Sequence, residues 1–455
     1  MLSERARRTL FAAIGAAIVL AFYLFFTVKS VGRYFDNDDM MNLYLAWSKP
    51  LSEVFRPIGG LFYRAMYAVA GFDPRPFRVA CLVIGAVNIG LCWRFAWLAS
   101  GSEAAAAFAG LLFAFHSRLM EVWFRTAVVY DSLCFLFFYS AACLYLEARR
   151  RGRMPGSWVS IGILALFVCA LGAKEVAMAL PAVLLAYEVL FEWKARWRRP
   201  ALIAGMFAVN IPYLWVKTHG AAAMTNNPAY RSEYTGQRFS EIWALFLNFL
   251  FILKDPIKPW MAVSILAGML LVAIAARSRR LMFAWCVAVF PALPISFLPY
   301  RGAYVLYLAY AGWVLYAGCA LASVCEWVAG REPRVRMAFT CVMFVLLGWW
   351  WGKRNLHDQR LDSRLWLYRS ADQVRSLVDA MRTLKPRLPR GAHVLFLEDA
   401  FGTDEWTPYF VVKLLYHDDT LLVDRIKMMD QKPGDWGTYH YVVAYEGGQY
   451  RLAKP

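Results

Sequence analysis

The feature that most constrains this chain is a series of long apolar runs, which recur from the N-terminus to about Gly352. Each run has about 16–20 residues with few charges, close to the length that an α-helix needs to cross a bilayer. Hydrophobic residues make up 60% of the 455 residues and charged residues 18%, whereas soluble chains contain about 45–50% and 25%. The sequence therefore predicts a polytopic membrane protein and disfavours a soluble enzyme, a disordered scaffold and a nucleic-acid-binding protein.

The basic residues indicate how the chain crosses the membrane. The net charge is +18, and much of the basic excess lies in short loops between apolar runs. Because cytoplasmic loops are rich in Lys and Arg, we interpret these clusters as topology signals and expect no nucleic-acid partner. Residues 10–28 lack a small-residue cleavage site, which predicts an uncleaved first span with a cytoplasmic N-terminus. The basic clusters lie at 149–153, 194–199, 277–280 and 331–336.

Placing the basic loops in the cytoplasm predicts about eleven transmembrane helices, provided that residues 242–253 do not cross. We expect that stretch to lie in the membrane interface or to re-enter. An odd number of spans puts the C-terminus outside, in the periplasm if the chain lies in a bacterial inner membrane. The predicted spans are 9–28, 78–99, 104–117, 127–147, 157–173, 175–191, 201–217, 260–276, 281–298, 303–324 and 335–352.

Three outer segments are large in this topology: 29–77, 218–259 and the tail after Gly352. The tail alternates short helix and strand patterns, which predicts a small α/β domain. The expected fold is an all-α membrane domain over residues 1–352 with a periplasmic α/β domain over residues 353–455. The elements predicted in the tail are a helix near 362–384, a strand at 393–397, a helix near 406–416, a strand at 421–423 and a hairpin over 441–450.

An acidic cluster in the first outer loop is the strongest candidate for chemistry. Asp36, Asp38, Asp39 and Asn42 follow the first span closely, and on a helix Asp36 and Asp39 share one face. One of these carboxylates could act as a general base. Alternatively, the acids cap the next helix or solvate the loop. We favour a functional role, because acids beside an anionic lipid surface need a partner and Arg56 supplies a cation in the same loop.

Ionisable residues also lie near the outer ends of several apolar runs, where burying charge is expensive. Glu121 has the alternative of pairing with Arg125 one helical turn later, and the Lys174–Glu175 pair that of a hairpin between two helices. A lysine at the outer face is suited to bind a lipid phosphate. The site candidates of this group are His116, Glu121, Asp131, Lys174 and Glu175.

Arg301 lies in another outer turn and has two interpretations, a phosphate ligand or an interfacial anchor. The many Arg and Lys residues of the outer loops favour an anionic ligand. Histidines of the outer segments lack the spacing of metal ligands, so we predict no metal site, with a divalent cation at the loop acids as the alternative. No P-loop or GxGxxG motif precedes a helix, so no nucleotide cofactor is expected.

In their order along the chain, these residues resemble the motifs of the GT-C superfamily of polytopic glycosyltransferases. The resemblance is strongest to bacterial relatives of the protein O-mannosyltransferases that carry tetratricopeptide repeats, and it covers about residues 30–315. Each motif is weak alone, and the specificity comes from their order. The matching positions are Asp38-Asp39 with Asn42, the element Phe55–Ile58, then His116, Glu121 and Asp131, the pair Lys174–Glu175 with Pro181, and loosely the element Tyr307–Gly312.

The chain also departs from that pattern. Arg78 and Gly85 stand where histidines are expected. Ser117 replaces the proline after His116, and Tyr304 replaces an arginine. No tetratricopeptide repeats follow the membrane part. These departures bear on the sugar and the acceptor more than on the superfamily.

The resemblance implies an inverting transfer on the outer face, from a polyprenyl-phosphate sugar of the hexosyl or mannosyl type to a hydroxyl of a protein or glycan. It also implies that an aspartate of the first loop is the base. We expect Asp39, with Asp38 as the alternative, because adjacent side chains point in different directions. Lys174, Arg301 and Arg56 are expected to neutralise the phosphate of the departing lipid carrier.

Glu121 and Asp131 are expected to orient the acceptor, the sugar or a basic partner. The leading rival interpretation is a transporter or flippase for a lipid-linked saccharide. Transporters usually contain internal repeats and ionisable residues near the midplane, whereas this sequence has no convincing repeat and its charged candidates cluster at one face. For the tail we expect a role in docking the acceptor, on the basis of its predicted position outside.

Overall fold

The computed structural model describes residues 4–192, 201–219, 223–330, 332–361, 365–384, 387–430 and 433–454. The basic cluster at 194–199 and Arg331 therefore lie outside the described residues. The chain divides into two compact units, which we describe separately. Unit 1 comprises Met1–Val28, Leu82–Trp123 and Val128–Leu361, and unit 2 comprises Lys29–Cys81, Phe124–Ala127 and Asp362–Pro455.

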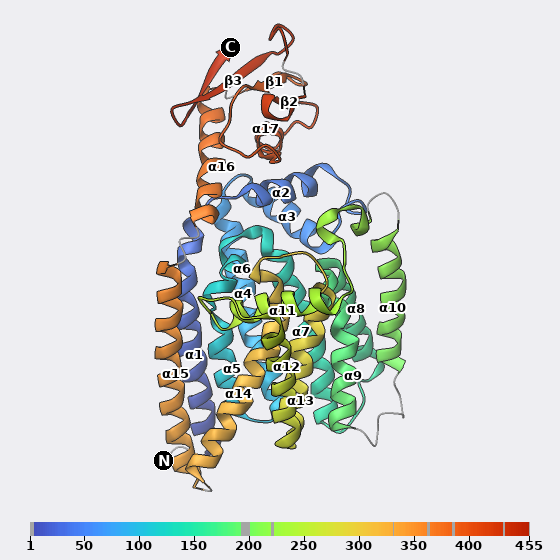
Figure 1. Ribbon diagram of the computed structural model, residues 1–455, viewed down its shortest axis with the longest axis vertical. Helices are drawn as coiled ribbons and strands as arrows, with labels where there is room; N and C mark the ends of the chain where they lie inside the picture. The colour runs from blue at the N-terminus through green and yellow to red at the C-terminus, as the bar shows by residue number, and fades with distance from the viewer. Residues whose placement is uncertain are drawn as a thin grey trace. The chain divides into compact units, whose positions relative to one another are not determined.

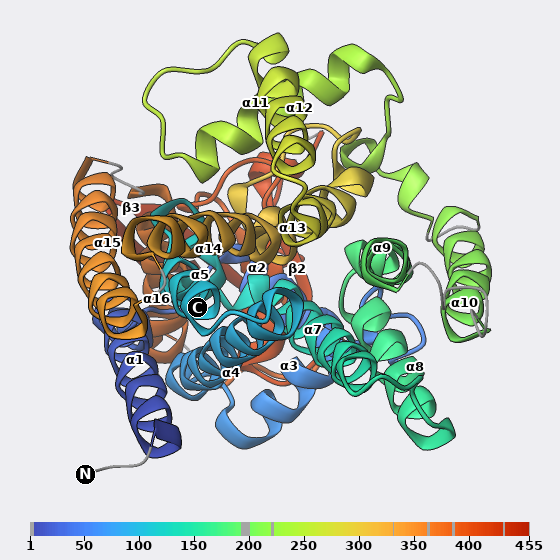
Figure 2. The ribbon, with the colours of Figure 1, turned by 90° about the horizontal axis from the view of Figure 1, so that it is seen from below.

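Unit 1 is a helical bundle (Figures 1 and 2). Its helices are α1 (Glu4–Thr27), α4 (Pro74–Ser100, beginning in unit 2), α5 (Glu103–Ala114), α6 (Glu121–Phe124), α7 (Val129–Arg150), α8 (Ser157–Ala173), α9 (Leu180–Phe191), α10 (Ala201–Thr218), α11 (Gly236–Leu250), α12 (Pro259–Ala275), α13 (Arg279–Val289), α14 (Tyr307–Ala329) and α15 (Pro333–Leu361). Within the described ranges, six helical segments are long and apolar enough to cross a membrane: Ala13–Gly32, Pro74–Ser100, Thr126–Arg150, Ala201–Thr218, Ala303–Val328 and Pro333–Arg360. This set of helices is typical of a multi-pass membrane protein.

Each of the predicted spans contains a helix, although several of these helices are short or interrupted. The predicted span 281–298 forms α13 and then the 3-10 helix η7 (Phe290–Ile295), because Pro291 and Pro294 lack the N–H that continues an α-helix. Residues 242–253 lie mostly in α11, which runs across the upright helices of unit 1 in Figure 1. Helix α11 is not among the six candidate spans. The number of eleven spans stays a prediction.

Helix α14 packs beside α5 and α13 in the core of unit 1 (Figure 2). The approach of α14 to α13 requires a glycine at position 312. A Cβ atom at Gly312 would lie 2.1 Å from the backbone nitrogen of Ala288, well inside van der Waals contact. The glycine of the family-like element therefore has a packing role.

We expect Gly312→Ala to lower the free energy of unfolding by about 1–3 kcal/mol, because the added methyl group must push two helix backbones apart. Gly268→Ala in α12 is a matched control, since a Cβ atom at Gly268 meets no atom within 4 Å. Alanine also favours the helix there, so the control variant should be at least as stable as the wild type. Thermal unfolding of the detergent-purified protein measures both, and equal Tm values would contradict the close packing of α13 and α14.

The tail of unit 2 forms the predicted small α/β fold. The strand order is β2-β1-β3-β4, in which β1 pairs in parallel with β2 and β3, and β3 pairs with β4 in antiparallel fashion. The hairpin turns at Gly447 and Gly448, which both have positive φ angles. The elements are α16 (Leu365–Leu384), β1 (His393–Phe396), α17 (Thr407–Leu415), β2 (Leu422–Arg425), β3 (Tyr441–Glu446) and β4 (Gln449–Lys454). The predictions for the tail are confirmed to within a few residues.

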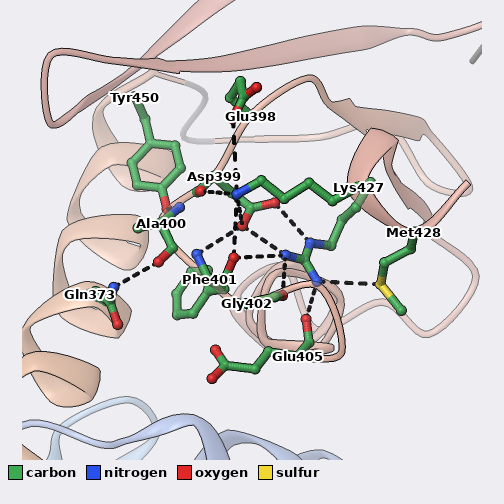
Figure 3. Close-up of polar contacts among 11 residues, drawn as sticks. Gln373, Glu398, Asp399, Ala400, Phe401, Gly402, Glu405, Lys427, Met428 and Tyr450 are labelled. Atoms are coloured by element: carbon green, nitrogen blue, oxygen red, sulfur yellow. Dashed lines mark hydrogen bonds and ion pairs between the residues drawn. The ribbon is translucent and has the colours of Figure 1, made fainter. Parts of the chain in front are cut away.

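A buried ion pair fixes the loop that follows β1 (Figure 3). The guanidinium of Arg425 donates to both carboxylate oxygens of Asp399 at 2.8 Å, to the carbonyl oxygen of Gly402 at 2.9 Å, and to that of Glu405. Lys427 donates to the carbonyl oxygen of Asp399 at 2.6 Å. The carboxyl ends of parallel strands are the usual ligand-binding edge of such a sheet. Here internal contacts occupy that edge.

The first loop belongs to the same compact unit as the tail. Its two helices are α2 (Asn37–Ser48) and α3 (Pro57–Ala70), and α2 packs against α17 and α16. The hydroxyl of Tyr44 donates to Asp419 at 2.6 Å, and that of Tyr67 donates to the carbonyl oxygen of Leu414 at 2.9 Å. These partners lie 375 and 347 positions apart in the chain. No pattern in the sequence predicted this association.

Candidate functional site

The acidic cluster of the first loop starts helix α2. Asp36 is the N-cap residue, and its Oδ1 accepts a hydrogen bond from the backbone N–H of Asp39 at 2.9 Å. In return, Oδ2 of Asp39 accepts from the backbone N–H of Asp36 at 3.1 Å. This capping box satisfies two N–H groups and places negative charge at the positive end of the helix dipole. The capping alternative therefore applies to both residues.

Asp39 is completely buried. Its Oδ2 also accepts from Nη2 of Arg78 at 3.2 Å, and its Oδ1 accepts from the hydroxyl of Tyr63 at 3.4 Å. Burial and the nearby charge of Asp36 raise the pKa of Asp39 to about 7, and the guanidinium of Arg78 limits the rise. A carboxyl group with such a pKa gains or loses its proton near neutral pH, as a general base does.

Asp38 differs from its neighbour in exposure, because its side chain is 51% exposed. The buried guanidinium of Arg125 forms ion pairs with both Asp36 and Asp38. Desolvation raises the pKa of Asp38, while Arg125 acts to lower it. Asp38 is therefore the carboxylate of the adjacent pair that is open to the surface, and Arg125 fixes its orientation.

The other two predicted site residues of this loop lie near helix starts in the same unit. Asn42 follows Asp38 by about one turn of α2 and is half-buried. Arg56 is the N-cap residue of α3, ahead of Pro57 at the first helical position. Its guanidinium lies over the ring of Phe55, 5.4 Å from the centroid. Unit 2 therefore contains all the predicted site residues of the first loop.

A second group of predicted site residues meets in unit 1. Lys174, the C-cap residue of α8, forms a buried ion pair with Asp131 in the first turn of α7. The ammonium group also lies 5.0 Å from the ring centroid of Tyr304. Tyr304, which stands where the family has an arginine, therefore contacts the lysine of the site with an aromatic face.

The turn around Gly302 lies in the same unit. A Cβ atom at Gly302 would lie 3.1 Å from Oε1 of Glu121, so this carboxylate lies against the turn. The neighbouring Arg301 has its guanidinium over the ring of Tyr230, 4.4 Å from the centroid. Glu175 is the first residue of the 3-10 helix η4 (Glu175–Ala179) and is half-buried. Carboxylates and cations thus lie close to several short, irregular segments of unit 1.

His116 is buried, and both of its ring nitrogens contact the backbone. Its Nδ1 accepts from the N–H of Arg118 at 3.2 Å, so Nε2 donates to the carbonyl oxygen of Leu250 at 3.1 Å. Next to it, Ser117 donates its backbone N–H to Oδ1 of Asn355 at 2.6 Å. A proline has no such N–H, so serine ties this segment to α15. A role of His116 in substrate binding stays a prediction.

Gly85 stands where the family pattern has a histidine, and this difference also has a structural reason. A Cβ atom at this position would lie 2.3 Å from the hydroxyl oxygen of Tyr23. That hydroxyl donates to the carbonyl oxygen of Leu82 at 3.0 Å, which holds the tyrosine ring in place. Tyr23 thus occupies the space that a larger side chain would need.

Two arginines of the site were missed as partners of the acids. From the sequence, Arg78 stands out only as a departure from the family pattern, although an ionisable residue in an apolar run is a usable signal. Local spacing pairs Arg125 with Glu121, one helical turn away in the sequence. Its pairing with Asp36 and Asp38 links segments 89 and 87 positions apart, which local spacing does not show.

Among the residues that the structure describes, no group of three or more His, Cys, Asp or Glu is arranged to hold a metal ion. The carboxylates of the first loop have Arg78 and Arg125 as their positive partners. The expectation that the site has no metal stays a prediction.

Comparisons with known proteins bear on the fold. No family model and no curated protein sequence matches the chain. The crystal structure of ArnT from Cupriavidus metallidurans in the apo state is 16% identical with a TM-score of 0.53, covering 97% of this chain and 94% of that one. The apo oligosaccharyltransferase of Archaeoglobus fulgidus is 10% identical with a TM-score of 0.53, covering 91% of this chain and 64% of that one. Both have the GT-C architecture, so the expected GT-C-like fold is confirmed.

Proposed function

We propose that this chain is an integral-membrane glycosyltransferase that uses a polyprenyl-phosphate sugar as donor and acts on the periplasmic face of a bacterial inner membrane. The observation that carries the proposal is the pair of adjacent carboxyl groups at the start of α2, one open and one titrating near neutral pH, in a chain with a GT-C fold. The acceptor oxygen forms a bond to C1 of the sugar as the bond from C1 to the phosphate oxygen breaks. The carboxylate takes the acceptor proton, and polyprenyl phosphate leaves with inversion at C1.

For the base we favour Asp38, because a base must come within hydrogen-bond distance of the acceptor hydroxyl and its side chain is open to the surface. Asp39 then acts as a positioning residue that caps α2 and holds Arg78. The sequence pointed to Asp39 first, and its pKa of about 7 keeps it as the second candidate. The two assignments differ in which variant, Asp38→Asn or Asp39→Asn, loses the larger part of its turnover.

The departing phosphate needs cations to neutralise its charge. The sequence predicts Lys174, Arg301 and Arg56 for this role, and we keep that prediction. Arg301 and Arg56 both lie over aromatic rings, which help to orient their guanidinium groups. Glu121 is proposed to bind a hydroxyl of the sugar or of the acceptor.

The proposed activity is tested with purified protein and a panel of polyprenyl-phosphate sugars offered with glycan and peptide acceptors. We expect release of polyprenyl phosphate with one donor class and an inverted anomeric linkage in the product. Reconstituted vesicles give the contrasting measurement for the transporter alternative. Movement of an intact lipid-linked sugar across the bilayer, without cleavage by the purified protein, would support the transporter and refute the transferase.

Turnover should fall as the pH is lowered through about 7, because protonated Asp39 no longer forms the ion pair that positions Arg78. The contribution of Asp39 to the free energy of unfolding should change in the opposite direction. The pKa of Asp39 is raised above its ordinary value of 3.8, so between pH 3.8 and 7 the folded state binds more protons at this residue than the unfolded state. The contribution of Asp39 to stability therefore improves as the pH falls through that window. Profiles of kcat and of Tm against pH, measured for the wild type and Asp39→Asn, check the two expectations. If the fall of kcat at low pH is unchanged in the variant, the titration of Asp39 is not its cause.

A further inference from the structure

Unit 2 contains a pocket that is separate from the acids of the first loop. Its volume is about 410 Å³, within the range of small-molecule sites. Helices α3, α16 and α17 and the segments that follow α3 and α17 supply its walls. The lining residues are Tyr67, Phe72, Arg382, Leu414, Leu415, Tyr416 and His417.

Aromatic rings make up much of the wall. The ring of Phe72 meets that of Tyr67 edge-on at 6.2 Å between centroids. His417 lies almost parallel to Tyr67 at 6.0 Å, and its other neighbour is Trp47 at 4.9 Å. Gly71 turns the chain at the end of α3 with a φ of 53°, which brings Phe72 back toward Tyr67. The wall therefore presents rigid, flat surfaces.

His417 itself has an unusual backbone conformation. It has a φ of 54° just after α17, in the left-handed region where glycine or asparagine is usually found. A histidine there costs conformational energy that a glycine would not. Its ring contacts with Trp47 and Tyr67 are the structural reason for an aromatic side chain at this position.

The polar groups of the pocket are fixed in orientation. Tyr67 donates to the carbonyl oxygen of Leu414 at 2.9 Å, and Nδ1 of His417 lies 3.4 Å from the same hydroxyl. Tyr416 donates to the carbonyl oxygen of Met381 at 3.2 Å. Burial raises the pKa of Tyr67 to about 12, so its hydroxyl is neutral and does not repel an anion. Within the described chain, Arg382 forms no ion pair. Its guanidinium lies 6.0 Å from the ring of Phe72.

We infer that this pocket binds one sugar residue that carries a carboxylate or phosphate group, as a part of the acceptor. The flat C–H face of a sugar ring packs on the aromatic rings, and its anionic group pairs with Arg382. A small inorganic anion would make no use of the rings, and an apolar ligand would leave Arg382 unpaired. Binding of such a sugar stands on the pocket alone, whereas its identity as the acceptor rests on the proposed function.

Direct binding to the purified full-length protein tests the inference. The probes are D-glucuronate, glucose 6-phosphate, glucose and inorganic phosphate, with affinities measured by calorimetry and ring contacts by saturation-transfer NMR. We expect both anionic sugars to bind more tightly than glucose and than phosphate. Arg382→Gln should weaken the anionic sugars by about tenfold and glucose by less than about twofold, as expected for one charge-assisted pair.

Arg375→Gln is the matched control, since Arg375 is on the same helix, carries the same charge, lies near Asp379 and does not line the pocket. It should bind all four probes as the wild type does. Phe72→Ala should weaken glucose and both anionic sugars alike, with Tm reporting whether it folds. Equal affinity of inorganic phosphate and glucose 6-phosphate, or no loss in Arg382→Gln, would overturn the inference. Displacement of the sugars by an acidic peptide of higher affinity would also overturn it.

Failure of this inference and of the proposed function can be told apart. Asp38→Asn should bind the anionic sugars normally even though its transfer activity is lost. Arg382→Gln should raise KM for an acceptor with an anionic sugar and leave kcat unchanged. If Arg382→Gln transfers with wild-type KM to such acceptors, the pocket is not the acceptor site, and the proposed transferase stands without it.

Discussion

Replacing Asp38 by asparagine should lower kcat by about 10²–10⁴-fold, the usual contribution of a general base, while leaving the fold intact. Asparagine has nearly the same shape as aspartate and cannot take a proton. The stability cost is small because the Asp38 side chain is 51% exposed and the buried Arg125 keeps Asp36 as a second carboxylate partner. Turnover at saturating donor and acceptor, with Tm measured in the same detergent, checks both halves of the expectation.

Asp39→Asn should behave differently. It removes the charge that pairs with the buried guanidinium of Arg78, so turnover should fall, though less than in Asp38→Asn, because Arg78 loses the partner that positions it. Its Tm should stay the same or rise, because burial already disfavours the charged form of Asp39. Asp379→Asn removes a 60% exposed carboxylate of the same unit and serves as the control, with unchanged kcat and Tm. If Asp38→Asn keeps wild-type kcat while Asp39→Asn loses it, Asp39 is the base and the assignment to Asp38 is wrong.

Much of the fold could be predicted because local sequence patterns determine many of its helices and turns. Apolar runs report helices directly, and in the tail the Gly447-Gly448 turn between two alternating segments gave a hairpin. The break at Pro291 and Pro294 inside one predicted span was also visible, although the prediction ran through it. The grouping of the first loop with the tail was not predictable, since it depends on contacts such as Tyr44 with Asp419 across 375 positions.

The candidate site, too, was predictable where it depends on local spacing and not where it depends on long-range contacts. Residue type and spacing identified Asp36 and Asp39 on one helical face, and the structure joins them in a capping box. Spacing could not tell that Asp39 is buried while Asp38 is open, because adjacent residues on a helix differ only through what packs against them. The cation that pairs with Asp38 comes from Arg125, outside the first loop. Pairing of charges across segments depends on the tertiary fold, for which a single sequence carries no direct signal.

Lys174→Met should destabilise unit 1 by about 3–5 kcal/mol, because it leaves Asp131 as a buried carboxylate without its ammonium partner. Asp131→Asn should have a similar effect, since Lys174 then loses its carboxylate. The double variant removes both charges and should recover most of the lost Tm. Thermal unfolding of the wild type, the two single variants and the double variant forms a complete double-mutant cycle. A double variant as unstable as the sum of the single variants would show that the two charges are not coupled.

The same cycle separates a structural role of Lys174 from the proposed role at the phosphate. If Lys174 only balances Asp131, the double variant regains turnover together with stability. If the ammonium neutralises the departing phosphate, the double variant regains its Tm and still turns over about 10²-fold more slowly, because methionine supplies no positive charge in the transition state. Lys174→Arg gives the complementary result: it keeps the charge but replaces the compact ammonium near Tyr304 with a planar guanidinium. The proposal therefore expects Lys174→Arg to retain more turnover than the double variant, even if its Tm is lower.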